Sequence, residues 1–118
     1  MGFVGAYSVS YENRCKYCIA AHFKMAHQEG VSVEVVDTIL SGEALKDNKL
    51  EALHCFVCSV VATRGFPEEK IIQNFLLNGY TKKNSLEVIL GVGLKTLSNY
   101  TNHIAHTPVD GAWNINQE

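Results

Sequence analysis

Hydrophobic side chains recur at three- and four-residue steps over most of this chain, the spacing that places them on one face of a helix. A clear example lies near the middle of the sequence, where the apolar positions are Leu50, Leu53, Val57, Val60 and Val61. The alternation typical of strands is weak, since VSVEVV alternates but follows a Gly-Val-Ser segment that favours a turn between helices. The pattern therefore predicts an all-α fold.

Helix-capping residues and glycines divide this pattern into about five to six helices. We expect a short leading helix in the first ten residues, followed by helices over 13–30, 32–42, 50–65, 67–79 and 81–107. Asn13 is the predicted N-cap of the second helix, and Pro67 suits the first turn of the fifth. The chain has 118 residues without internal repeats or linkers, so residues 1–118 form a single domain.

Composition excludes several classes of protein. Hydrophobic residues make up 47% and charged residues 19%, a balance typical of globular rather than disordered chains. The net charge of -2 does not favour nucleic-acid binding. The longest nearly apolar run, residues 88–94, is shorter than the roughly 20 residues of a membrane span, and the first residues lack the basic segment of a secretory signal. We expect a cytoplasmic protein with no nucleic-acid or membrane partner.

Four cysteines form two pairs, Cys15/Cys18 and Cys55/Cys58. In a reducing compartment such cysteines are usually catalytic, metal-binding or buried. Cys15, Cys18 and His22 follow steps of three and four residues, so they line up on consecutive turns of one helix face. The helix start favours a thiolate at Cys15, and His22 can take the proton of Cys18 or pair with its thiolate. Two such thiols can close a disulfide after one is oxidised.

The same cysteines allow a second interpretation, a tetrahedral zinc site made by all four. It is disfavoured because both pairs lie within helical patterns and the gap between them is wider than in compact zinc ribbons. Cys55 and Cys58 are better explained as small apolar residues on a buried helix. We therefore expect neither a metal ion nor a cofactor.

The stretch ENRCKYCIAAHFKMAHQEGVS resembles the redox motif of the alkyl hydroperoxidase D (AhpD-like)/carboxymuconolactone decarboxylase superfamily, which places CxxCxxxH on a helix. LEALHCFVCSVVATRGFP and NFLLNGYTKKNSLEVILGVGLKTLSNYTNHIAHTPVD are also similar, so the resemblance covers about residues 9–110. It implies an AhpD-like helical domain that assembles as a homo-oligomer, commonly a trimer or hexamer. Gly91 and Gly93 in the last helix are expected to permit close helix packing, including across a subunit contact.

The implied activity is that of a thiol peroxidase, in which a thiolate attacks a hydroperoxide and the cysteine pair closes to a disulfide. An unidentified thiol reductant then restores the dithiol. By resemblance Cys18 is the peroxidatic cysteine, Cys15 its resolving partner and His22 part of the proton relay, whereas the helix dipole alone favours Cys15 as the more acidic thiol. Two alternatives remain: lactone decarboxylation, although that branch generally lacks the CxxC pair, and a redox-sensing oligomer without turnover.

The sequence departs from the family pattern at one position. Well-studied members carry a glutamate about three helical turns before the first cysteine, and that position falls near Phe3 here, with no acid before Glu12. Glu12 and His103 are therefore the candidate replacements in the proton relay. The missing glutamate bears on peroxidase turnover, whereas thiol–disulfide chemistry needs only the cysteines.

Overall fold

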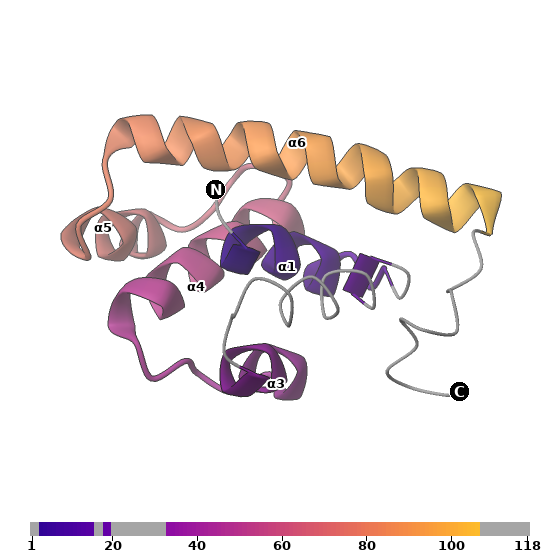
Figure 1. The fold of residues 1–118 in the computed structure, drawn as a ribbon. Helices are drawn as coiled ribbons and strands as arrows, with labels where there is room; N and C mark the ends of the chain where they lie inside the picture. The colour runs from indigo at the N-terminus through magenta and orange to yellow at the C-terminus, as the bar shows by residue number, and fades with distance from the viewer. Residues whose placement is uncertain (1–2, 16–17, 20–32, 107–118) are drawn as a thin grey trace.

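The computed structural model describes residues 3–15, 18–19 and 33–106. Within these ranges the chain forms helices and no strand, which confirms the all-α prediction (Figure 1). The helices are α1 (Phe3–Glu12), α3 (Val33–Ser41), α4 (Asn48–Ala62), α5 (Glu69–Leu77) and α6 (Lys82–Ala105). Cys18 and Ile19 are also helical, while the rest of the helix predicted over 13–30 and the tail after residue 106 lie outside the described residues. Among the helices of the described part, none has the length and apolar character needed to span a membrane.

Helix α1 is the centre of the arrangement, packing against α3, α4 and α6. In Figure 1 the long helix α6 runs across the top, α1 lies beneath it and α3 lies at the bottom, while α5 packs on α4. The buried side chains come from all of these helices, with Tyr7 and Val9 from α1 among them. The others include Val36, Ile39, Phe56, Val57, Phe75 and Val88. The packing thus joins α1 to α6, and this contact places the residues of the candidate site together.

The helix ends follow the signals in the sequence. Gly42, Gly65 and Gly79 have φ angles of 77°, 92° and 96°, a left-handed conformation that glycine adopts without steric cost, and each follows a helix as predicted. The leading helix is confirmed and extends to Glu12. One prediction is wrong: Pro67 precedes the N-cap Glu68 of α5 rather than lying in the first turn.

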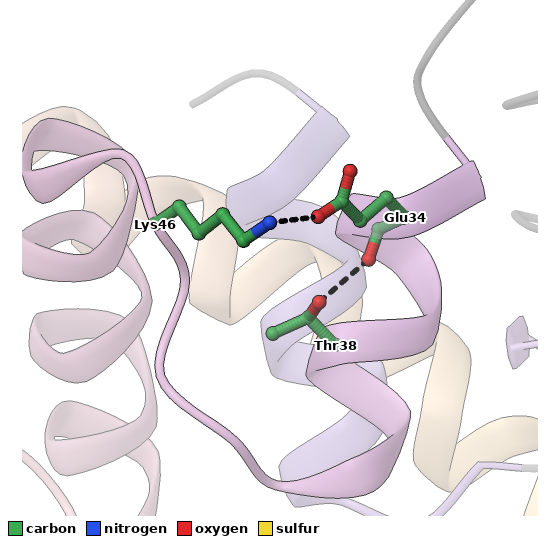
Figure 2. A network of polar contacts seen from close by, with 3 residues as sticks. All are labelled: Glu34, Thr38 and Lys46. Atoms are coloured by element: carbon green, nitrogen blue, oxygen red, sulfur yellow. Dashed lines mark hydrogen bonds and ion pairs between the residues drawn. The ribbon is translucent and has the colours of Figure 1, made fainter.

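An ion pair connects α3 to the loop that leads into α4. Lys46 Nζ lies 2.8 Å from Glu34 Oε1, and the Thr38 hydroxyl donates to the Glu34 carbonyl oxygen at 2.7 Å (Figure 2). Lys46 lowers the pKa of the Glu34 carboxyl by hydrogen bonding and by its charge. Both charged side chains are exposed, so water screens the pair and its contribution to stability is small.

Candidate functional site

The turn after α1 positions the first cysteine, and it differs from the prediction. Asn13 is not the N-cap of a new helix, because its N–H donates to the Val9 carbonyl oxygen at 2.9 Å and completes α1. Arg14 follows with φ 56°, and Cys15 N–H donates to the Ser10 carbonyl oxygen at 3.0 Å. This is the hydrogen-bond pattern of a Schellman motif, which ends a helix and reverses the chain. The next helix therefore begins after Cys15.

Cys15 and Cys18 are joined by a disulfide, with their Cα atoms 5.3 Å apart. The Cys15 carbonyl oxygen accepts the Ile19 N–H at 2.9 Å, and its sulfur accepts the Cys18 N–H at 3.4 Å. Cys15 thus has the role of an N-cap, with Cys18 in the first turn behind it. Cys15 is fully buried and Cys18 is 4% exposed. The structure brings together the pair that the CxxC spacing predicts.

Two side-chain amides of α6 contact the sulfur of Cys18. Asn99 Nδ2 donates to Cys18 Sγ at 3.0 Å, and Asn102 Nδ2 donates to the same atom at 3.3 Å. Their spacing of three residues places both on one face of α6. Asn99 is fully buried, where an amide without hydrogen bonds would be costly, whereas Asn102 is half-buried.

Further hydrogen bonds fix the orientation of the Asn99 side chain. Asn13 Nδ2 donates to Asn99 Oδ1 at 3.0 Å, which directs the other end of the carboxamide towards sulfur. Asn99 Nδ2 also donates to the buried Ser10 hydroxyl at 3.4 Å. Residues at the end of α1 and on α6 therefore act together on one atom of the disulfide.

These two amides are not among the site residues predicted from the sequence. A signal was present, because Asn is unfavourable inside helices and Asn99 and Asn102 have i, i+3 spacing within the last one. Asn13 was assigned to a helix cap instead. Which group the amides contact depends on how α6 packs on α1, and sequence spacing carries no information on that.

The three residues predicted to transfer protons are His22, Glu12 and His103, and the structure describes the last two of them. His22 lies outside the described residues. Glu12 is close enough to His54 for its charge to raise the pKa of that imidazole, although burial dominates and lowers it. His103 is exposed, with its ring 6.4 Å from that of Tyr100. Among the described contacts, neither Glu12 nor His103 has a hydrogen bond or ion pair to the disulfide, and their relay role stays a prediction.

The other cysteine pair has a different environment. Cys58 Sγ lies 3.7 Å from His54 Nδ1, and burial, together with the charge of Glu12, raises the pKa of Cys58 to about 12. Cys55 donates to Glu51 Oε2 at 3.2 Å, and burial raises its pKa to about 11. Both thiols are therefore protonated near neutral pH. They are half-buried rather than fully buried, so the prediction that they belong to the core is correct only in part.

The structure does not support a zinc site made by all four cysteines. Cys15 and Cys18 form a disulfide with each other, and the Cys55 thiol donates a hydrogen bond to Glu51. In the part of the chain that the structure describes, no three His, Cys, Asp or Glu side chains are grouped for metal binding. No protein-family model matches the sequence, and no curated protein matches it significantly. The functional assignment therefore depends on the disulfide-forming pair and its surroundings.

Proposed function

We propose that this protein is an AhpD-like thiol oxidoreductase that reduces hydroperoxides through Cys15 and Cys18. The observation that carries the proposal is the disulfide between these two cysteines at the start of a helix. A dithiol that closes to a disulfide is the redox group that such chemistry requires, without a metal or cofactor. The resemblance of the CxxCxxxH segment to the AhpD-like motif supplies the hydroperoxide as substrate.

In the proposed cycle the Cys18 thiolate attacks the terminal oxygen of the hydroperoxide and the O–O bond breaks. Cys18 becomes a sulfenic acid, and the alkoxide takes a proton and leaves as an alcohol. The Cys15 thiolate then attacks the Cys18 sulfur, the S–O bond breaks, and the hydroxide takes a proton and leaves as water. A cytoplasmic thiol reductant donates two electrons to restore both thiols. We assign the proton transfers to His22, following the resemblance.

The first test is the intact mass of the reduced protein before and after one equivalent of cumene hydroperoxide. We expect the loss of two hydrogens, which marks one disulfide. Trypsin cleaves after Arg14 and Lys16, so each cysteine of the pair lies on its own peptide and the disulfide links the two. An unchanged mass, or a link between Cys55 and Cys58, would overturn the proposal.

Substitution tests the assignment of the cysteines. Cys18→Ser is expected to abolish peroxide consumption in the presence of dithiothreitol, because the serine hydroxyl is not ionised and cannot reduce the peroxide. Cys55→Ser is the matched control and is expected to retain full activity, since the Cys55 thiol is protonated and donates a hydrogen bond to Glu51. Consumption that stops after one equivalent in the wild type would favour the redox-sensing alternative.

We further propose that the protein is a homo-oligomer in which α6 packs against a second copy of the chain. Leu86, Leu97 and Ile104 on this helix are 66%, 69% and 81% exposed. A groove of about 520 Å³ lies between α6 and the end of α4, lined by apolar residues that include Val61 and Leu97. Exposed apolar surface of this kind is typical of protein interfaces.

The order of exposed positions on α6 favours a second copy as the partner. Six of them follow alternating steps of four and three residues, the spacing of a helix–helix seam, at Leu86, Leu90, Gly93, Leu97, Tyr100 and Ile104, and the exposed Ile89 and Leu94 lie beside this series. This series is symmetric about position 95, so two α6 helices can pair antiparallel around a two-fold axis. At Gly93 a Cβ atom would have no neighbour within 4 Å, which leaves room for close helix approach. The resemblance implies a trimer or a hexamer, and a two-fold contact is compatible with the hexamer.

A further inference from the structure

We infer that Asn99 and Asn102 form a hydrogen-bond site for a thiolate, and that this site stabilises the ionised sulfur of Cys18. The inference rests on the proposed function, in which one cysteine of the pair must ionise. It gives the two amides a direct role at the reacting atom. It also makes Asn13 a positioning residue, because Asn13 acts on Cys18 only through Asn99.

The distances and burial around Cys18 support this role. The two Nδ2 atoms lie 3.0 and 3.3 Å from the sulfur, and Asn99 is fully buried. A hydrogen bond to an ionised acceptor is stronger than one to a neutral acceptor, and burial increases the difference. The same two amides therefore stabilise a Cys18 thiolate more than they stabilise either a neutral thiol or a disulfide sulfur.

The described contacts of Cys15 and Cys18 differ in number and distance. Within the described residues, Cys15 Sγ accepts one hydrogen bond, from the Cys18 N–H at 3.4 Å. Cys18 Sγ accepts two shorter ones from α6. The positive end of the helix dipole favours a thiolate at both sulfurs, so the two amides determine which thiol has the lower pKa. The result favours Cys18, against the expectation from the helix dipole alone.

Asn13 decides which end of the Asn99 side chain faces sulfur. Its Nδ2 donates to Asn99 Oδ1 at 3.0 Å, which leaves Asn99 Nδ2 directed at Cys18. In the reverse orientation the carbonyl oxygen would face the sulfur and oppose ionisation. Asn13 lies at the end of α1 beside the left-handed residue Arg14, so the turn that presents Cys15 also sets the orientation of the amide.

The test is the rate of iodoacetamide alkylation of each cysteine in the reduced protein as a function of pH, because only the thiolate reacts. In the wild type we expect the lower thiol pKa at Cys18. Asn99→Ala and Asn102→Ala are each expected to raise the pKa of Cys18 by about one unit, with a smaller change at Cys15. Asn13→Ala is expected to raise it less. Thr101→Ala is the matched control on α6, where the hydroxyl bonds its own helix at Leu97, and is expected to have no effect.

Circular dichroism of each variant shows whether it folds. Asn102 is half-buried, so Asn102→Ala keeps the test decisive even where Asn99→Ala does not fold. An unchanged Cys18 pKa in the folded variants, or an equal shift at Cys15, would overturn the inference. If the wild type consumes no peroxide but the Cys18 pKa shifts as expected, the inference stands and the proposed peroxidase function fails.

Discussion

At the scale of single residues, two cysteine pairs with the same spacing have opposite surroundings. The sulfur of Cys18 accepts two amide hydrogen bonds, which favour a thiolate. Cys58 lies where burial and the charges of Glu12 and Glu51 all raise its thiol pKa. Spacing alone therefore does not decide which CxxC segment is suited to redox chemistry. The local balance of hydrogen-bond donors, burial and charge does.

His54 provides a pH-dependent contribution to stability. The Ser8 hydroxyl donates to the Val4 carbonyl oxygen, so it accepts a hydrogen bond from His54 Nδ1 at 2.7 Å. Burial lowers the pKa of His54 below its ordinary value of 6.5, so the unfolded chain binds more protons near that pH. This contribution is present above pH 6.5 and is lost as the pH falls below it. The histidine therefore favours the folded state in its neutral form.

We expect wild-type stability to decrease from about pH 7 to pH 5, and His54→Gln to reduce that decrease because it removes the buried titrating group. Urea unfolding at a series of pH values measures the free energy of unfolding of both proteins. His103→Gln changes an exposed histidine and serves as the control. An equal pH dependence in His54→Gln and the wild type would contradict the prediction.

At the scale of helices, the site depends on the ends of α1 and α6. The Schellman motif after α1 presents Cys15, and the N-terminal cap of α6 fixes the start of the helix that carries both amides. Thr81 accepts the Asn84 N–H, while the Asn84 side chain accepts the Thr81 N–H, which is a capping box.

Thr81→Ala removes one side of this cap and is expected to lower the free energy of unfolding by about 1 kcal/mol. Urea unfolding at constant pH measures the loss, with Thr101→Ala on the same helix as the control. The cap lies several turns from Asn99, so the thiol pKa of Cys18 should not change. A stability equal to that of the wild type would show that the cap contributes nothing measurable.

At the scale of the whole molecule, α6 has two dissimilar faces. One packs on α1 and α4 and buries Val88 and Asn99, and the other exposes the leucines of the helix. A second copy that covers the exposed face would also cover the groove beside α4. The proposed oligomer and the cysteine site therefore use opposite sides of one helix.

We expect the wild-type mass in solution to be at least twice the 13.0 kDa of one chain. Light scattering after size-exclusion chromatography measures this mass. Leu97→Glu places a charge within the proposed interface and is expected to separate the copies at this contact, which lowers the mass of the oligomer. Ser98→Glu introduces the same charge at an exposed residue of α6 outside the seam and should leave the oligomer intact. A monomeric wild type would contradict the proposal.

The sequence by itself determined the helical fold class, most helix ends and the pair of cysteines. These depend on local physics: apolar periodicity, the conformational freedom of Gly42, Gly65 and Gly79, and, for Cys15 and Cys18, a CxxC spacing at a helix start that allows two sulfurs to meet. Two local predictions failed, at Asn13 and at Pro67, because the residue at which a helix begins or ends depends on the backbone hydrogen bonds of the neighbouring turn as well as on the residue type.

Only the tertiary structure decided what surrounds the sulfurs. Asn99 and Asn102 lie more than 80 positions from Cys18 in the sequence, and their contact with it exists because α6 packs on α1. Burial also separates the two cysteine pairs, since desolvation and nearby carboxylates raise the pKa of Cys58. Spacing sets which groups a helix can present together, and packing sets the charge and the hydrogen bonds that each group meets.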